Sequence, residues 1–334
     1  MNRRDTLGAL LALGALAGPL RAGAQAQRPA GPFRIALLPD IGVVRRKQFI
    51  DAMRETAWTE GREFTVVESG FKWSPQIEPA AKHVVATKPD LILATSEAYA
   101  AAAHRLTTKM PIVMWVSGYP VEKGVALSLA RPGKNVTGSA NYAGTGIWGK
   151  LLELLRDSKP DIRRIGVLWD YLPPAFQTEL VPAVQQELRR DIARALGVTV
   201  HFVDVSEPDR APAAMSEIYA QRPDALLATA GPMLGPVRSR VTQFAIEKRL
   251  PLISDSQWPQ IEPQPLLTYS ASPVALMRQA AYYVVRILRD GANPGELPIQ
   301  QPAKFELVVN LKTAKAIGLT LPKSMLVRAD EVIE

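Results

Sequence analysis

The pattern with the clearest chemical meaning in this sequence is a set of three glycines, Gly144-x-Gly146-x-x-Gly149, that leads into an apolar-periodic segment. Twenty-one residues after the last glycine, the apolar run RIGVLWD ends at Asp170. Glycines at a helix N-terminus can hold a pyrophosphate, and an acid about 20 residues further on can bind a ribose. One hypothesis is therefore an exported NAD(P)-dependent oxidoreductase.

Other catalytic chemistry has little support in the residue types. The sequence has no cysteine, which excludes a thiol nucleophile and a thiolate metal ligand. The three histidines, His83, His104 and His201, fall in two predicted helices and a strand, with no second ligand at metal spacing. No G-x-S-x-G nucleophile elbow is found. We therefore expect a protein that is not an enzyme and that uses no cofactor and no metal.

The elements that would position these residues occur twice along the chain. The segment RIALLPD at 34–40 matches RIGVLWD at 164–170, and KPDLILATS at 88–96 matches RPDALLATA at 222–230. A third pair, KMPIVMWVS and KRLPLISDS, aligns on Pro111 and Pro251. The order of the three pairs is preserved and the spacing changes little, which indicates two similar halves.

Each half alternates short, continuous Ile/Val/Leu runs with helical segments. Such runs are typical of buried parallel strands, and their alternation with helices predicts a parallel sheet covered on both faces. The expected fold is therefore α/β, with two doubly wound parallel-sheet lobes joined by crossover segments. Among the helices, we expect one over 45–60, with Phe49, Ile50, Met53 and Ala57 on one face and Gly61 as its C-terminal cap.

The duplication also offers a different explanation of the glycines. Asp170 has a counterpart in Asp40, which ends the first strand of the first half with no glycine motif before it. The segment NVTGSANY before the glycines is polar, unlike the apolar first strand of a dinucleotide-binding fold. The glycines fall at the junction of the halves, where they suit a chain that turns into a crossover helix over 147–157.

The N-terminus has the features of an export signal. Arg3 and Arg4 precede an apolar run of about a dozen residues and small residues up to Ala26, as in a signal peptide. We expect cleavage near Ala24 or Ala26 and a soluble, periplasmic mature protein. The formal net charge of +8 is spread along the chain without a basic block, so we expect no nucleic-acid partner.

Two segments resemble a known family. GVALSLARPGKNVTGSANY, followed by KLLELLRDSKPDIRRIGVLWD, and the C-terminal KFELVVNLKTAKAIGL are similar to ABC transporter substrate-binding proteins of the tryptophan/tyrosine-uptake type. The resemblance implies a periplasmic binding protein of the type I kind that captures a small organic ligand between its lobes. It also implies an ABC permease partner in the inner membrane and a monomeric state. Lys134 and the loop WDYLPP at 169–174 depart from the common family pattern.

Ligands of open parallel sheets bind beyond the carboxyl ends of the strands, and those ends would face one cleft between two lobes. We expect lobe 1 to comprise 33–143 plus 268–300 and lobe 2 to comprise 144–267 plus 301–334, after a signal peptide over 1–26. The expected ligand-binding residues follow the strands or lie at the junctions: Asp40, Ser96, Glu97, Ser117, Gly118, Tyr119, Tyr142, Trp169, Asp170, Tyr171, Gly231, Pro232, Asp255, Ser256 and Tyr269.

Aromatic residues are concentrated at these positions. Tyr119, Tyr142, Trp169, Tyr171 and Tyr269 all fall at strand ends or junctions, although only 7% of the chain is aromatic. One hypothesis is a cleft that stacks on an aromatic amino acid or a flat, apolar acid. The alternative is that these rings seal contacts between the lobes or pack at the hinge.

Overall fold

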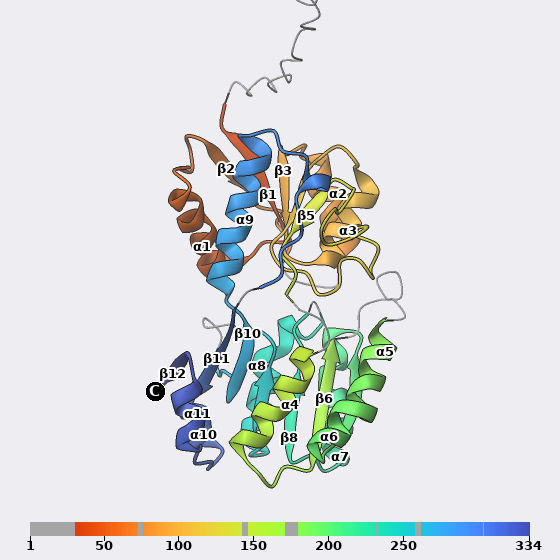
Figure 1. The fold of residues 1–334 in the computed structure, drawn as a ribbon, viewed down its shortest axis with the longest axis vertical. Helices are drawn as coiled ribbons and strands as arrows, with labels where there is room; N and C mark the ends of the chain where they lie inside the picture. The colour runs from red at the N-terminus through yellow and green to blue at the C-terminus, as the bar shows by residue number, and fades with distance from the viewer. Residues whose placement is uncertain are drawn as a thin grey trace, which may run out of the picture. The chain divides into compact units, whose positions relative to one another are not determined.

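The computed structural model describes residues 31–72, 76–141, 146–170, 180–231, 233–257, 262–302 and 304–334. Pro32–Glu334 form one compact unit, separate from Met1–Gly31. The expected signal peptide and its cleavage site lie outside the described residues. Within the compact unit the strands form two sheets, each with helices on both faces, so the predicted α/β fold with two lobes is confirmed (Figure 1).

The first sheet has the order β2-β1-β3-β4-β5, and all of its strands are parallel. Its strands are β1 (Phe33–Leu38), β2 (Phe64–Val67), β3 (Leu91–Ala94), β4 (Ile112–Met114) and β5 (Val136–Gly138). Alternate residues of β1 point to opposite faces, as the period of a strand requires. Ile35 and Leu37 join the core under α1 (Gly42–Glu55), whereas Ala36 and Leu38 join the core under α2 (Ile77–Ala86) and α3 (Glu97–Leu106).

The second sheet repeats this order as β7-β6-β8-β9-β10 and then continues with β11 and β12. Its strands are β6 (Arg164–Asp170), β7 (Thr199–Val205), β8 (Ala225–Ala228), β9 (Leu252–Ser254), β10 (Leu267–Ala271), β11 (Phe305–Asn310) and β12 (Glu331–Ile333). The β10–β11 pair is antiparallel. The expectation of purely parallel sheets is therefore wrong at this pair, because β11 enters from the other lobe and runs against β10.

The faces of the second sheet are covered by two sets of helices. One core includes α4 (Gly146–Ser158), α5 (Leu180–Glu187), α6 (Ala193–Leu196), α10 (Leu311–Ala316) and α11 (Lys323–Arg328), and the other includes α7 (Ala211–Ala220) and α8 (Arg238–Glu247). A π-helical segment, Leu188–Ile192, joins α5 to α6, and single 3-10 turns span Pro208–Arg210, Gly235–Val237 and Pro294–Glu296.

Two aspartates at equivalent positions of the two halves, Asp90 and Asp224, make equivalent hydrogen bonds, which supports the duplication. Asp90, just before β3, accepts a hydrogen bond from the backbone N–H of Arg34 at 2.7 Å. Asp224, just before β8, accepts one from the backbone N–H of Arg164 at 2.8 Å. Each acid follows a proline and secures the beginning of the first strand of its own sheet. The KPD and RPD segments therefore serve the same purpose in both halves.

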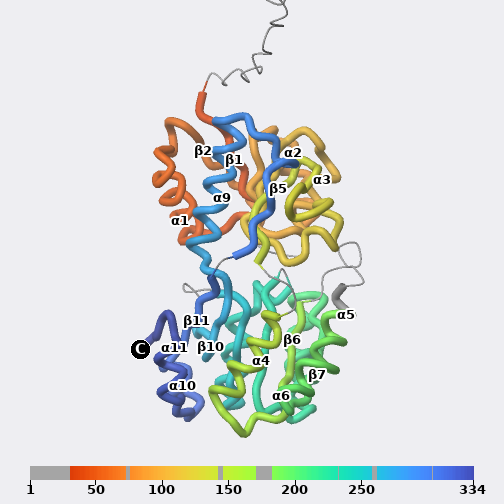
Figure 2. Tube along the Cα trace, viewed as in Figure 1, coloured from red at the N-terminus to blue at the C-terminus, as the bar shows by residue number. Residues whose placement is uncertain are grey.

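Two helices cross from one sheet to the other (Figure 2). The first sheet ends its repeat at β5, yet the next helix, α4, packs in the core of the second sheet. The second repeat ends at β10, and the following helix, α9 (Pro273–Leu288), packs beside α1 in the first lobe (Figure 1). Residues 268–271, which we assigned to lobe 1, pair as β10 in the second sheet, so that boundary is corrected to the start of α9.

Helix α1 ends earlier than its apolar pattern suggests. Phe49, Ile50 and Met53 are buried on one face as expected, but the helix ends at Glu55 and Ala57 is exposed with φ +63°. Gly61 does not cap the helix; it lies in the turn before β2, where its N–H donates to the carbonyl of Phe64 at 2.7 Å. The positive φ that ends the helix falls on an alanine, a residue that rarely adopts it.

Candidate functional site

On the first lobe, the expected site residues cluster at the carboxyl ends of β3 and β4. Glu97, the first residue of α3, accepts a hydrogen bond from the N–H of Gly118 at 3.0 Å and pairs with Lys123 at 2.5 Å. Burial by itself raises the pKa of Glu97, but the ammonium of Lys123 and the Gly118 N–H outweigh it, so this pKa lies below its ordinary value. Lys123 is therefore part of the site, although its position in a long loop gave no signal in the sequence.

The carboxyl ends of β3 and β4 form the first-lobe wall of the candidate site. Two serine hydroxyls on this wall are buried without a hydrogen-bond partner in the described part of the chain. Ser96 is 8% exposed, Ser117 is fully buried, and neither Oγ has a partner. Ser96 occupies the N-cap position of α3, but its side chain makes no capping hydrogen bond. Buried hydroxyls are normally satisfied, so these two groups are candidates for contact with a ligand or ordered water.

On the second lobe, Asp170 ends β6 in a half-buried position. One of its oxygens, Oδ2, accepts hydrogen bonds from the N–H groups of Met233 and Leu234 at 2.8 and 2.7 Å. Burial raises the pKa of Asp170 to about 7 despite these two donors, and the nearby charge of Asp255 acts in the same direction. Asp170 is thus an acid whose ionisation falls near neutral pH.

Gly231 and Asp255 complete this wall. A Cβ on Gly231 would lie 2.3 Å from the carboxyl carbon of Asp170, so only glycine lets the chain approach the acid this closely. Asp255 is 1% exposed and accepts a hydrogen bond from the N–H of Ala230 at 2.6 Å. The segment after β8 is therefore held between the two acids.

The corresponding acid of the first lobe, Asp40, has a different role. Its carboxylate accepts hydrogen bonds from the N–H of Ser69 at 2.6 Å, the hydroxyl of Ser69 at 2.9 Å and the N–H of Gly70 at 3.1 Å. Asp40 thus fixes the segment that follows β2. The two strand-end acids are equivalent in sequence, but the amides that surround them differ.

The aromatic residues divide between the site and the core. Tyr119 lies partly exposed on the first lobe, and its hydroxyl accepts a hydrogen bond at 3.1 Å from the indole N–H of Trp148, which belongs to α4. Burial raises the pKa of Tyr119 to about 12, so this phenol is neutral. Trp169, in contrast, lies in the core against Trp148 and Phe202, with ring centroids at 4.9 and 5.8 Å.

Tyr269 is also accounted for by packing. It stacks on Phe305 with centroids 5.5 Å apart, where β10 and β11 leave the second sheet for the other lobe. The alternative of hinge packing therefore describes Tyr269 better than a role in stacking on a ligand. Tyr142, Tyr171 and Pro232 lie outside the described residues.

A cavity of about 1120 Å³ separates α1 of the first lobe from the segment around Arg238 of the second lobe. Arg45 of α1 crosses to the second lobe, donating to the carbonyl of Gln257 at 2.7 Å, while its guanidinium lies 5.2 Å above the ring of Trp115. Burial, followed by repulsion from Arg238, lowers the pKa of Arg45 to about 10. Among the expected site residues, only Asp40 lines this cavity within the described chain.

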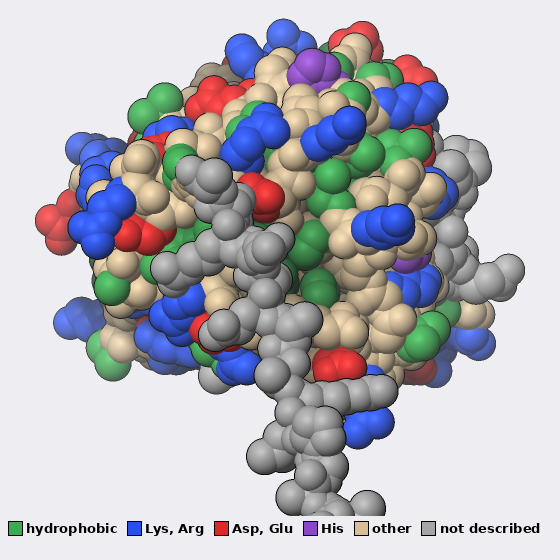
Figure 3. Space-filling model, turned by 90° about the horizontal axis from the view of Figure 1, so that it is seen from above, with side chains coloured by type: hydrophobic (Ala, Val, Ile, Leu, Met, Phe, Trp, Pro, Cys, Tyr) green, Lys and Arg blue, Asp and Glu red, His purple; other side chains and the backbone are tan. Residues whose placement is uncertain are grey.

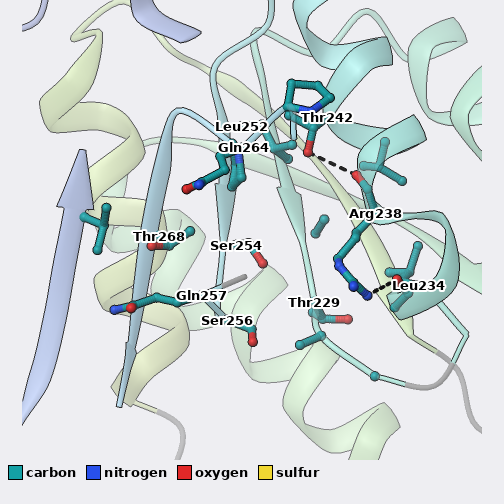
Figure 4. Close-up of a pocket in the computed structure, with 18 of the residues that line it drawn as sticks. Thr229, Leu234, Arg238, Thr242, Leu252, Ser254, Ser256, Gln257, Gln264 and Thr268 are labelled. Atoms are coloured by element: carbon teal, nitrogen blue, oxygen red, sulfur yellow. Dashed lines mark hydrogen bonds between the residues drawn. The ribbon is translucent and has the colours of Figure 1, made fainter. Parts of the chain in front are cut away.

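Ser256 and Gly231 line a different cavity, which lies under α8 in the second lobe (Figure 4). The titratable candidates belong to one electrostatic neighbourhood, because Lys123 and Asp255 act on the pKa of Asp170 while Asp255 and Glu97 act on that of Tyr119. Within the described residues the site thus presents two buried hydroxyls without a hydrogen-bond partner, a phenol, an ion pair, one half-buried acid and one buried acid.

Two further features bear on the chemistry. No three His, Asp or Glu side chains in the described ranges are grouped to hold a metal ion. Among the same residues, no helix has the length and apolar character needed to cross a membrane. On the face shown in Figure 3, Lys and Arg side chains are interspersed with Asp and Glu, in keeping with the scattered charge of the sequence.

Two doubly wound sheets, linked by crossing helices and carrying polar groups at their strand ends, define a two-lobed binding protein of the type I periplasmic kind. A domain from Streptococcus pneumonia solved in complex with L-Trp has this fold, with a TM-score of 0.75, 19% identity and coverage of 90% of this chain and 100% of that one. A conserved domain protein from Vibrio cholerae is similar, with a TM-score of 0.76, 21% identity and coverage of 90% and 99%.

The family is established from sequence. Residues 44–333 match the model for ABC transporter substrate binding proteins, so the chain belongs to this family of solute-binding components of ABC importers. A curated relative, the tyrosine-binding protein of Clostridioides difficile (strain R20291), is 25% identical over 275 residues, which cover 82% of this chain and 76% of the relative. The family resemblance expected from the sequence is confirmed, and the oxidoreductase alternative is not favoured.

Proposed function

We propose that this protein captures an aromatic α-amino acid between its lobes and delivers it unchanged to an ABC permease. The observation that carries the proposal is the placement of two buried hydroxyls without a partner in the described chain on one lobe, and of two strand-end acids, Asp170 and Asp255, on the other. An α-amino acid carries a carboxylate and an ammonium group, which need hydrogen-bond donors and anionic acceptors respectively. The ligands named for the relatives, tyrosine and L-Trp, support the same chemical class.

The carboxylate is assigned to the first lobe. Ser96 and Ser117 each have a buried hydroxyl without a partner in the described chain, and Ser96 stands at the N-terminus of the ten-residue helix α3. The first N–H groups of a helix have no intrahelical partner and favour an anion. The Glu97 carboxylate lies beside them but is neutralised by Lys123, so it does not repel a second carboxylate strongly.

The ammonium group is assigned to the second lobe. Asp170 is half-buried and Asp255 is buried, both at strand ends. The pKa of Asp170 is raised mainly by burial and further by the charge of Asp255, and a ligand cation relieves that repulsion. Binding of an ammonium group therefore lowers the pKa of Asp170 and releases part of a proton near neutral pH.

The side chain of the ligand is assigned to the surroundings of Tyr119. This ring is fixed by the hydrogen bond from Trp148 and is partly exposed. Aromatic pairs in offset or edge-to-face arrangements gain about 0.5–1.5 kcal/mol beyond area burial. Selectivity for tyrosine or tryptophan over leucine is the expected consequence.

Isothermal titration with L-tyrosine, L-tryptophan, L-leucine and N-acetyl-L-tyrosine tests this assignment. We expect saturable one-to-one binding of the first two, and weaker binding of leucine and of the acetylated compound, which lacks the ammonium. The Asp170→Asn variant should bind about tenfold to a hundredfold less tightly, the cost of a hydrogen bond to a charged group. Asp161→Asn, at a side chain that is 74% exposed, is the matched control. Tight binding of sugars or metal ions, with no aromatic amino acid bound, would overturn the proposal.

The glycine motif has a structural role in this proposal. Gly146 begins α4, and a Cβ on Gly149 would lie 3.3 Å from a methyl carbon of Ile192, so Gly149 permits close packing against the π-helical segment. Gly144 lies outside the described residues. Titration with NAD should give no stoichiometric binding, whereas clear binding would favour the oxidoreductase.

We further propose that the protein is exported by a signal peptide cleaved near Ala24 or Ala26 and acts in the periplasm as a monomer. The basic, apolar and small-residue pattern of residues 1–26 supports export, and family membership supports a permease partner in the inner membrane. The mass of the periplasmic product and its sedimentation coefficient test cleavage and monomeric state together. A cytoplasmic product that retains residues 1–26 would contradict this.

A further inference from the structure

A second cavity lies within the second lobe, on the face of the sheet covered by α8 (Figure 4). Its volume is about 60 Å³, and its floor is one row of residues across five strands. The register pairs Ala228 with Ser254, Ser254 with Thr268, Thr268 with Val308, and Val308 with Glu331. Residues directly opposite each other share a face of a sheet, so all five side chains point to the same side.

The first lobe shows how this position is filled when packing alone is required. Ser254 corresponds to Met114, three residues after the aligned Pro111 and Pro251. Met114 pairs with Ala94 and Gly138 in the equivalent row and is fully buried in the same core as Tyr99. The first repeat thus places a long side chain where the second repeat has a hydroxyl. The cavity is therefore a feature that distinguishes the second lobe, not a consequence of the fold.

One polar side chain of the cavity has no hydrogen-bond partner among the described residues. Thr268 is 6% exposed, and its Oγ1 has no hydrogen-bond partner in the described chain. Buried hydroxyls of this kind are rare and are usually satisfied by a bound molecule or water. The guanidinium of Arg238 extends from α8 toward the side on which Ser254 and Thr229 lie, and one of its nitrogens donates to the carbonyl of Gly235 (Figure 4).

We propose that this cavity binds a short aliphatic monocarboxylate, at a site separate from the inter-lobe site. The carboxylate lies against Arg238 and accepts hydrogen bonds from Ser254 and Thr268, because a guanidinium with hydroxyls suits a planar anion. The hydrocarbon part packs on Val241 and Leu252, which line the cavity from α8 and β9. The small volume restricts the ligand to a compact acid.

The site adjoins the contact between the lobes. Arg238 and Gly235 line both this cavity and the inter-lobe cavity. Gln257 lines the second-lobe cavity, and its carbonyl accepts the hydrogen bond from Arg45 of the first lobe. An experiment must therefore distinguish a carboxylate bound under α8 from one bound between the lobes.

Acetate is the probe, titrated into the purified protein by saturation-transfer NMR and calorimetry, with and without saturating L-tyrosine. We expect saturable binding that L-tyrosine does not displace, and weaker binding of the neutral analogue acetamide. Ser254→Met introduces the residue of the first lobe and should abolish acetate binding. Thr268→Val keeps the shape but removes the hydroxyl and should weaken binding about tenfold, whereas the exposed control Thr199→Val should not.

The proposal is overturned if acetate does not bind saturably, if L-tyrosine displaces it, or if both cavity variants bind it like the wild type. Should Ser254→Met fail to fold, the nearly isosteric Thr268→Val variant decides. L-tyrosine binding is read separately in Ser254→Met, where we expect it to be retained. Failure of L-tyrosine to bind any form would count against the inter-lobe proposal and leave the acetate result to decide this one.

Discussion

Asp170 combines a half-buried position with two backbone donors on one oxygen. The N–H groups of Met233 and Leu234 favour the ionised carboxylate, yet burial raises its pKa to about 7. In the unfolded chain an aspartate has a pKa near 3.9. Between these two values the folded protein holds a proton that the unfolded chain has lost. The acid therefore links folding and ligand binding to pH.

The pH dependence of stability follows from this raised pKa. Because the native state binds more protons between pH 4 and 7, the contribution of Asp170 to the free energy of unfolding falls as pH rises through this range. Over the whole range the contribution of Asp170 to the free energy of unfolding changes by at most about 4 kcal/mol, since each unit of pKa difference between the folded and unfolded chain corresponds to about 1.36 kcal/mol. We expect Asp170→Asn to remove this slope in urea unfolding at pH 5 and pH 7, without ligand. Equal differences between the two pH values in both proteins would contradict the raised pKa.

Gly231 supports Asp170 by leaving room for its carboxylate. In Gly231→Ala, the new Cβ would lie 2.3 Å from the carboxyl carbon, so the acid or the chain must move. We expect a loss of about 1–3 kcal/mol in stability, typical of overpacking, and weaker L-tyrosine binding. Gly146→Ala is the matched control, because no atom lies within 4 Å of its added Cβ. Thermal unfolding and calorimetry of both variants give the comparison, and equal behaviour would refute the role of Gly231.

For single residues, the sequence predicted which positions lie at the strand ends, but it did not predict what each side chain contacts there. Asp40 and Asp170 were found from repeated strands, but their different partners depend on which amides the loops bring close. Trp169 sits at a strand end, as a ligand-stacking residue would, yet it lies in the core. Lys123 was missed because its contact with Glu97 joins a loop residue to the first residue of α3, which is distant in sequence.

The element that links the two lobes most directly is the helix that follows the fifth strand of each repeat. α4 leaves β5 and packs in the second lobe, while α9 leaves β10 and packs in the first. Each lobe therefore depends on a helix supplied by the other half of the sequence. A continuous segment that runs only from the first to the fifth strand of a repeat therefore lacks one of the helices that pack on its sheet, α9 for the first sheet and α4 for the second.

The N-terminal cap of α10 gives a prediction about the stability of this helix. Asn310 ends β11, is 3% exposed, and accepts the N–H of Thr313 at 3.0 Å, which caps α10. We expect Asn310→Ala to lower the free energy of unfolding by about 1–2 kcal/mol. The exposed Lys312→Ala, in the same helix, should change it little. Denaturant unfolding measures both, and a neutral Asn310→Ala would show that the cap contributes nothing.

Periodicity predicted most elements because buried parallel strands and amphipathic helices have distinct patterns. The antiparallel pairing of β10 and β11 was not predicted, because nothing in either strand records the direction of its partner. The early end of α1 was missed for a related reason. Its apolar pattern continues to Ala57, where a positive φ on a non-glycine residue ends the helix.

Side-chain contacts between the two lobes hold them in the arrangement of this structure. Arg45 reaches Gln257 across the cavity, and Tyr119 accepts a hydrogen bond from Trp148 of α4. These contacts join the first lobe to the second beside the two walls of the proposed site. A ligand that touches both walls would favour this arrangement over a more open one, in proportion to its differential affinity.

Arg45→Gln tests this arrangement. The shorter side chain loses the hydrogen bond to Gln257 and the position over Trp115, so the arrangement of the lobes that has this contact is less populated and L-tyrosine binds less tightly, about tenfold. Arg54→Gln, on the same helix with a side chain that is 61% exposed, should bind normally. Calorimetry gives the affinities, and X-ray scattering gives the radius of gyration with and without ligand. Unchanged affinity in Arg45→Gln would show that this contact does not favour the arrangement that binds the ligand.

A crystal structure of the protein grown with L-tyrosine shows whether the ligand is captured between the lobes. We predict an intact amino acid there, with its carboxylate toward Ser96 and Ser117 and its ammonium toward Asp170 and Asp255. Density for a chemically altered molecule, for a ligand elsewhere with the walls between the lobes vacant, or for the reverse orientation would contradict it.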